Sequence, residues 1–170
     1  MLNLKCIKYQ IHDDGIAFIN LNRNPVNAFN LILLEELDKV INDIKDNSKC
    51  KLIIFRSLQK HFSAGADLAE RKMMSKKTTL SFLEKINKLF NDIEDLNIPT
   101  IASINGAALG GGLELALCCD FRIATQNSIS CMCGRTFVVE LLFSPSLVSA
   151  PYPVSSALFV GAEHWPVDAS

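Results

Sequence analysis

Two short segments rich in glycine and alanine hold the residues whose types could do chemistry. Residues 62–68 read FSAGADL and residues 105–116 read NGAALGGGLELA, and each follows an apolar run. Small side chains let a ligand approach the backbone closely, and free backbone N–H groups at such turns can donate hydrogen bonds to an oxygen that gains negative charge. The plainer alternative for each segment is an ordinary turn that packs a strand against a helix.

The second segment also offers a carboxylate. Its glycine triplet, residues 110–112, precedes an expected helix. The first N–H groups of a helix lack internal partners, and the helix dipole is positive there, which suits an anion or an oxyanion. Glu114 lies on the first turn, where a carboxylate could position water or move a proton. The alternative is a solvated glutamate that complements the helix dipole.

Other catalytic and binding motifs fit the sequence poorly. The glycines do not give GxGxxG, no Gly-Lys-Ser/Thr follows them, and there is no GxSxG elbow. The histidines show no ligand spacing; His61 precedes the first segment, and a surface or structural role is favoured for it. The six cysteines form no CxxC pair, so no metal site is predicted. Without a signal or transit pattern at Met1, we expect reduced thiols in a cytoplasmic protein.

Apolar patterns place these segments in an alternation of strands and helices. Period-two and buried runs predict strands, and one-sided apolar spacing predicts helices. The strands are expected at residues 4–11, 16–21, 51–56, 100–104 and 121–124, and the helices at 31–47, 78–96 and 113–119. The alternation indicates an α/β fold with parallel pairing after a first hairpin. Both small-residue segments then follow buried strands, so their amides could meet at one end of the sheet.

The composition bounds the class of protein and changes along the chain. The 170 residues are 49% hydrophobic and 21% charged with a net charge of -1, which fits a globular chain without a basic surface for nucleic acid or membrane. Residues 129–170 hold only four charged side chains. Residues 141–162 hold none, but their three prolines disfavour a membrane-spanning helix. We expect a core at 1–128 and an atypical, poorly ordered or loosely packed tail at 129–170.

Three segments in this order resemble the enoyl-CoA hydratase/isomerase (crotonase) family. They are residues 25–30 (PVNAFN), 62–68 and 98–120, and the resemblance covers about residues 5–128. Residues 65–75 (GADLAERKMMS) resemble the methylglutaconyl-CoA hydratase branch. The resemblance implies an α/β fold, a crotonase-like spiral of β-β-α units that is incomplete at its C-terminus.

The resemblance also implies roles for individual residues. The N–H groups of Ala66 and Gly111 would form an oxyanion hole for a thioester carbonyl, and Glu114 matches the first catalytic glutamate of the family. Contacts with coenzyme A would come from Ala64, Asp67, Leu68 and Gly110. The implied enzyme is a lyase or isomerase of fatty acid metabolism acting on a 2-enoyl-CoA, with coenzyme A entering as part of the substrate and no other cofactor.

The chain departs from the family pattern after residue 124. The family continues with Phe-Gly-x-Pro-Glu, whose glutamate is the second catalytic carboxylate; here the register gives Gly134, and the nearest carboxylate is Glu140. The family's C-terminal helices, which complete its trimers or hexamers, are not recognised either. We hypothesise a truncated or reading-frame-altered product, which comparison of the three coding frames would test.

Three other readings stay open. The chain could be a catalytically impaired acyl-CoA binder, or it could fail to fold stably without the family's subunit contacts. The branch includes RNA-binding members, but a solvated helix face is favoured for the basic cluster here. That cluster comprises Arg71, Lys72, Lys76, Lys77, Lys85 and Lys88.

Overall fold

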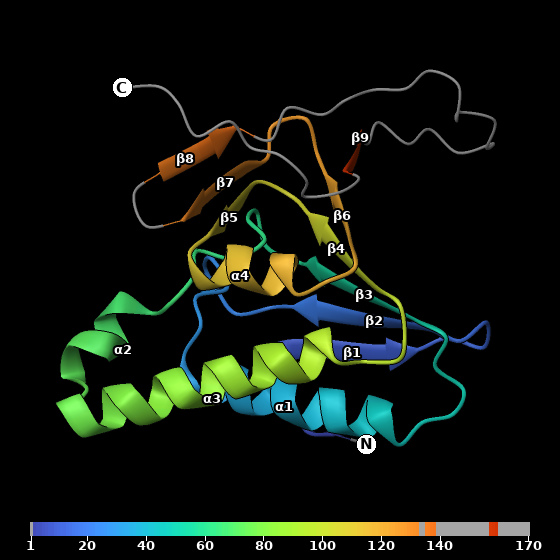
Figure 1. The fold of residues 1–170 in the computed structure, drawn as a ribbon, viewed down its shortest axis with the longest axis horizontal. Helices are drawn as coiled ribbons and strands as arrows, with labels where there is room; N and C mark the ends of the chain where they lie inside the picture. The colour runs from blue at the N-terminus through green and yellow to red at the C-terminus, as the bar shows by residue number, and fades with distance from the viewer. Residues whose placement is uncertain (1, 133–134, 139–156, 160–170) are drawn as a thin grey trace.

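The computed structural model describes residues 2–132, 135–138 and 157–159 (Figure 1). A six-stranded sheet has the order β1-β2-β3-β4-β6-β9, and a three-stranded sheet has the order β5-β7-β8. The strands are β1 Ile7–Ile11, β2 Ile16–Leu21, β3 Leu52–Ser57, β4 Thr100–Ile104, β5 Ala107–Leu109, β6 Phe121–Ala124, β7 Ile129–Met132, β8 Arg135–Val138 and β9 Ala157–Phe159. The helices are α1 Leu31–Lys45, α2 Leu68–Met73, α3 Lys76–Glu94 and α4 Gly111–Leu117.

The large sheet follows the predicted topology. β1 and β2 pair antiparallel as a hairpin, and β2, β3, β4 and β6 pair parallel in that order. Helices α1 and α3 run side by side along the sheet (Figure 1). Their apolar faces meet the inward side chains of the strands in one core, in which Ile19, Phe55 and Leu37 are fully buried. The predicted β-α-β units, in which buried strands alternate with amphipathic helices, are therefore present in the structure.

Within residues 1–128, two short elements were not predicted, and neither were strands β7, β8 and β9 beyond them. Helix α2 buries none of its side chains, so residues 68–73 carry no apolar periodicity that could reveal it. Strand β5 lies inside the glycine-rich stretch and is only three residues long. The two expected helices at 78–96 and 113–119 exist as α3 and α4, each beginning two residues earlier.

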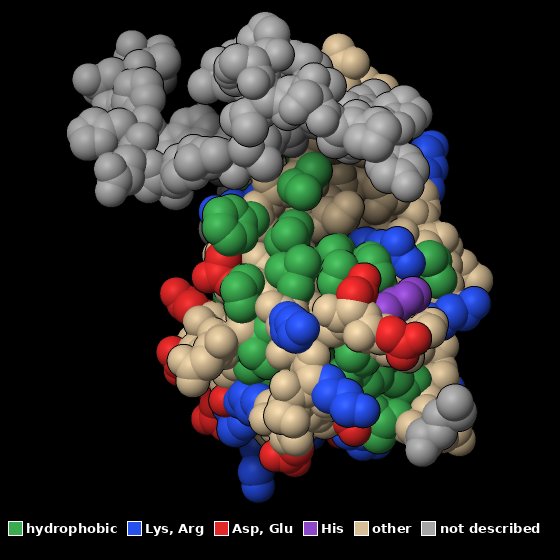
Figure 2. Space-filling model, turned by 90° about the vertical axis from the view of Figure 1, so that its right-hand side faces the viewer, with side chains coloured by type: hydrophobic (Ala, Val, Ile, Leu, Met, Phe, Trp, Pro, Cys, Tyr) green, Lys and Arg blue, Asp and Glu red, His purple; other side chains and the backbone are tan. Residues whose placement is uncertain are grey.

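The face of the large sheet turned away from α1 and α3 carries a row of apolar side chains. Phe18, Ile54, Ile101 and Phe121 lie opposite one another on four neighbouring strands. Phe121 is 51% exposed. Figure 2 looks at the side with the β1–β2 turn and the start of β4, and it shows hydrophobic side chains gathered among charged ones.

The part of the chain beyond residue 128 contributes strands to both sheets. β7 pairs with β5, β8 with β7, and β9 with the edge of β6. The rest of the predicted tail, including most of residues 141–162, lies outside the described residues. The division of the chain near residue 128 stays a prediction. Within the described residues, no helix combines the length and the apolar character that crossing a membrane requires.

Candidate active site

Backbone hydrogen bonds hold the two small-residue segments side by side. The N–H of Phe62 donates to Asn105 O at 2.8 Å. The N–H of Ser63 donates to Ala107 O at 3.1 Å, and the N–H of Leu109 donates back to Ser63 O at 2.9 Å. The structure therefore brings together the two loops that the sequence placed after separate strands.

Gly65 shows how closely the loops approach. Its φ is +81°, a conformation that suits glycine. A Cβ at this position would lie 2.5 Å from Leu109 O and 3.1 Å from the backbone nitrogen of Gly111. A side chain at Gly65 would therefore fill the space beside the Gly111 amide, which places one predicted oxyanion donor against the loop that carries the other.

Phe29 fixes the direction of the Ala66 amide. The N–H of Phe29 donates to Gly65 O at 2.7 Å, and the N–H of Asp67 donates to Phe29 O at 2.9 Å. Successive groups of an extended chain point in opposite directions, so the N–H of Ala66 faces away from Phe29. Within the described part of the chain, neither this N–H nor that of Gly111 donates a hydrogen bond. The loops thus present two unpaired donors.

The Phe29 side chain also lies close to Gly111. A Cβ on Gly111 would lie 3.2 Å from a ring carbon of Phe29. The ring is fully buried and packs edge-on against Phe90 of α3, with 6.0 Å between the ring centroids. One core residue therefore contacts both donor loops, with its backbone at Ala66 and its ring at Gly111.

Helix α4 carries the carboxylate candidate. Gly110 is its N-cap with φ 47°, and its carbonyl accepts hydrogen bonds from the N–H groups of Leu113 and Glu114 at 2.9 and 3.0 Å. Glu114 is exposed. Its carboxylate forms no hydrogen bond or ion pair with the described residues, so it is available to a bound molecule. The structure places Gly110, Gly111 and Glu114 on one turn.

The coenzyme candidates of the first loop differ in their surroundings. The N–H of Ala64 is occupied, since it donates to Val26 O at 2.9 Å. Leu68 begins α2 and is 73% exposed. Asp67 is the N-cap of α2, and its Oδ1 accepts from the N–H groups of Ala69 and Glu70 at 3.0 and 3.1 Å. Its carboxylate is thus used within the protein.

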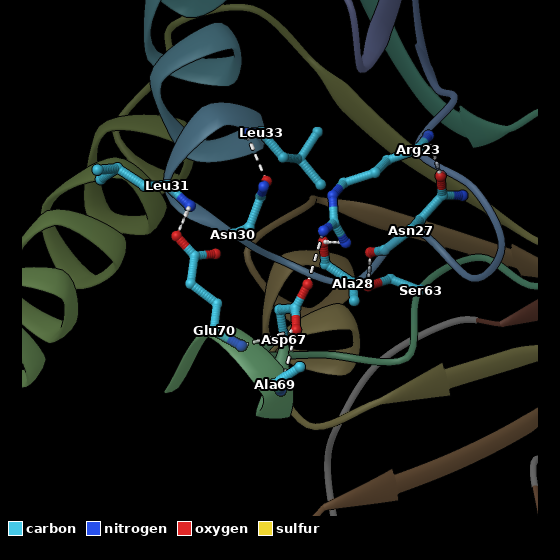
Figure 3. A network of polar contacts seen from close by, with 10 residues as sticks. All are labelled: Arg23, Asn27, Ala28, Asn30, Leu31, Leu33, Ser63, Asp67, Ala69 and Glu70. Carbon is cyan, nitrogen blue, oxygen red and sulfur yellow. Dashed lines mark hydrogen bonds and ion pairs between the residues drawn. The ribbon is translucent and has the colours of Figure 1, made fainter. Parts of the chain in front are cut away.

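An arginine absent from the sequence-based site holds the other oxygen of Asp67. Nη2 of Arg23 lies 2.6 Å from Asp67 Oδ2, and Nη1 donates to Ala28 O at 2.9 Å (Figure 3). The Glu70 N–H and, less strongly, the Arg23 guanidinium hold the pKa of Asp67 below its ordinary value, against the opposing effect of partial burial. Arg23 and Asp67 are 44 positions apart in the sequence, so no local pattern could reveal this pair.

Asn27 is a second residue that the sequence did not single out. It is fully buried with φ 51°, and its side-chain amide donates to Phe62 O at 3.0 Å and to Ser57 Oγ at 2.7 Å. The backbone carbonyl of Asn27 accepts a hydrogen bond from Ser63 Oγ at 2.7 Å (Figure 3). Asn27 thus ties its own loop to the first small-residue segment. The sequence feature that could have pointed to Asn27 is that a polar residue stands within segment 25–30, which resembles the family.

The remaining candidates have structural surroundings. Nδ1 of His61 accepts the N–H of Ala107 at 3.1 Å, in line with the structural role favoured for it. In the basic cluster, Lys85 pairs with Glu35 at 3.4 Å and Lys88 with Asp92 at 2.6 Å. The described residues hold no group of three His, Cys, Asp or Glu side chains arranged for a metal. Gly134 and Glu140 lie outside the described residues.

Known proteins share this arrangement of strands and loops. A family model described as enoyl-CoA hydratase/isomerase matches residues 12–137. Mouse methylglutaconyl-CoA hydratase is 45% identical over 116 residues, which are 67% of this chain and 37% of the mouse protein. Human enoyl-CoA hydratase domain-containing protein 2 is 40% identical over 119 residues, 69% of this chain and 41% of the human protein.

Solved structures agree with the sequence relatives. The enoyl-CoA hydratase of Bacillus anthracis superposes with a TM-score of 0.71 at 36% identity, covering 74% of this chain and 50% of that one. DspI of Pseudomonas aeruginosa gives a TM-score of 0.73 at 28% identity, with 78% and 50% covered. The chain spans less than half the length of the two curated relatives, and the predicted crotonase-like α/β fold is confirmed over the shared part. The chain belongs to the enoyl-CoA hydratase/isomerase family.

Proposed function

We propose that the chain binds a 2-enoyl-CoA thioester and adds water to it or shifts its double bond. The observation that carries the proposal is a pair of amides, Ala66 N–H and Gly111 N–H, that donate no hydrogen bond to the described residues and lie on loops that touch at Gly65. Two such donors suit a thioester oxygen, which gains negative charge when the acyl group becomes an enolate. The names of the relatives, enoyl-CoA and methylglutaconyl-CoA hydratase, support this class of substrate.

Glu114 supplies the proton chemistry in this proposal. For hydration, the oxygen of water bonds to C3 of the enoyl group while its proton passes to the Glu114 carboxylate. The double-bond electrons move to the thioester oxygen, which the two amides hold. A proton then returns to C2 and restores the carbonyl. For isomerisation, the carboxylate removes one proton from an enoyl thioester and returns it two carbons away through the same enolate.

The second candidate is an acyl-CoA binder with impaired catalysis. It is favoured by one feature of the sequence: Gly134 stands where the family register has a glutamate. A chain that keeps Glu114 but lacks the second carboxylate is expected to lose more of its water-addition activity than of its double-bond isomerisation activity. Ala64, Leu68 and Gly110 would contact coenzyme A in both candidates.

Hydration of crotonyl-CoA by the purified chain separates the two candidates. An active chain lowers the ultraviolet absorbance of the conjugated enoyl thioester, because adding water or moving the double bond removes the conjugation. Analysis of the product distinguishes the two reactions. We expect Glu114→Gln to lower kcat about 100-fold or more with little change in binding, because it removes the proton-transfer group. Tight binding of crotonyl-CoA with no turnover would establish the binder. No binding of either crotonyl-CoA or coenzyme A would overturn both.

A further inference from the structure

A single guanidinium ties together both sides of the short bridge that orients Ala66. Arg23 donates to the carbonyl of Ala28, the residue before Phe29, and to the carboxylate of Asp67, the residue after Ala66. Phe29 makes two hydrogen bonds to the residues flanking Ala66, and the other hydrogen bonds between the two segments, from the Ala64 N–H and Ser63 Oγ, lie on the Gly65 side. The arginine therefore adds a contact on the opposite side, at Asp67.

The backbone of Arg23 is held in place by Asn27. The backbone N–H of Arg23 donates to Asn27 Oδ1 at 2.7 Å, and the backbone N–H of Asn27 donates to Arg23 O at 2.8 Å. Asn27 is fully buried and anchored to Phe62 by its side chain. The side chains of Arg23 and Asp67 are 23% and 18% exposed, compared with 51% and 50% for Lys85 and Glu35. The Arg23–Asp67 pair is thus better shielded from solvent than that surface pair.

We propose that Arg23, acting through Asp67, is a positioning residue for the Ala66 N–H. The inference rests on the proposed function, in which that N–H holds the thioester oxygen. Asp67 has two tasks on separate oxygens: Oδ1 caps α2 and Oδ2 receives Arg23. Without Arg23, the cap keeps α2 in place. Within the described residues, the long 3.5 Å hydrogen bond from the Leu31 N–H to Glu70 Oε1 is then the contact, besides the Phe29 bridge itself, that still links the Asp67 side to the segment carrying Ala28. The direction of the Ala66 N–H is then no longer fixed.

Four substitutions separate the positioning role from effects of charge and of folding. Arg23→Gln removes both guanidinium contacts. Asp67→Asn keeps an oxygen that can cap α2, since asparagine is also a good N-cap, but removes the ion pair. Arg23→Lys keeps the charge without the planar fork that reaches two acceptors at once, so it should restore only part of the function. Lys88→Gln is the control for net charge, because Lys88 pairs with Asp92 on α3.

The readout is the polarisation of a bound carbonyl, which needs no turnover. The probe is 4-(dimethylamino)cinnamoyl-CoA, a push–pull chromophore whose absorption moves to longer wavelength when its thioester oxygen accepts hydrogen bonds. We expect a red shift in the saturated complex of the unaltered chain. In Arg23→Gln and Asp67→Asn the shift should fall by about half, since one of two donors is misaligned. The double variant should show no further loss, and Lys88→Gln should keep the full shift.

The possible outcomes lead to different conclusions. If the unaltered chain shows the shift and the Arg23 and Asp67 variants show it in full at saturation, the positioning role is overturned and the proposed function stands. If the unaltered chain binds the probe without any shift, the proposed function fails and the positioning role fails with it. If Arg23→Gln does not fold, as judged by circular dichroism, Arg23→Lys and Asp67→Asn decide by the same criterion.

Discussion

At the scale of single residues, the site depends on what is missing at Gly65. A methyl group there would meet Leu109 O at 2.5 Å and the backbone nitrogen of Gly111 at 3.1 Å. The positive φ adds a cost of about 1–2 kcal/mol for any residue with a Cβ. Gly65 therefore serves both the turn and the open space beside the donor.

Gly65→Ala is expected to abolish the red shift of the bound cinnamoyl probe, because the new methyl group displaces the carbonyl oxygen from Gly111. Gly15→Ala is the matched control, since Gly15 also has a positive φ (+88°) and a Cβ there would lie 2.7 Å from Lys49 O. Both variants should lose stability in urea unfolding, but only Gly65→Ala should lose the shift. A Gly65→Ala chain with the full shift would contradict the proposed place of the oxyanion.

At the scale of elements, helix α4 packs directly against the first small-residue segment, at Ser63. A Cβ at Gly112 would lie 2.6 Å from Ser63 Cβ and 2.7 Å from Ser63 O. Backbone cannot move aside as a flexible side chain can, so the helix would have to shift away from the first loop.

Gly112→Ala is expected to destabilise the chain by about 1–3 kcal/mol through overpacking, even though alanine favours helices. Leu117→Ala, at a position on the same helix that is 48% exposed, should change the free energy of unfolding little. Urea unfolding followed by circular dichroism compares the two. A stabilised Gly112→Ala chain would show that α4 does not pack against Ser63 as described.

The sequence predicted elements wherever periodicity reports burial. Leu33, Leu37 and Ile44 recur on one face of α1, and the helix formed as expected. It could not predict α2, which is held by the Asp67 cap instead of by buried side chains. The same holds for the site. The glycine segments could be identified from the sequence, but Arg23 and Asn27 bond to partners 44 and 35 positions away, and such separations leave no local pattern.

At the scale of the whole molecule, the thiols link stability to pH. Burial raises the pKa of Cys119 from its ordinary 9.0 to about 12. Burial also raises the pKa values of Cys6 and Cys50. A raised pKa means that the folded chain keeps its proton while the unfolded chain loses it, so this stability is present below pH 9 and is lost as the pH rises from about 9 to about 12.

The free energy of unfolding should therefore fall between pH 7.5 and pH 10, with Cys119 contributing about 1.4 kcal/mol of the loss. Urea unfolding in the presence of a reductant at both pH values measures it. Cys119→Ala should show a smaller fall than the unaltered chain by about that amount. An equal fall in both would mean that the Cys119 thiol is not shielded from solvent in the folded state.

Phe29 has a consequence that reaches beyond the site itself. Because its backbone pairs on both sides of Ala66 and its ring lies beside Gly111, we expect the size of this ring to affect the spacing of the two amides. Phe90 of α3 packs edge-on against that ring, so a substitution in the hydrophobic interior is expected to change the space between the two amides that are proposed to hold a thioester oxygen. Interior and site cannot vary independently here, and tolerance to substitution around Phe29 should be judged by carbonyl polarisation as well as by melting temperature.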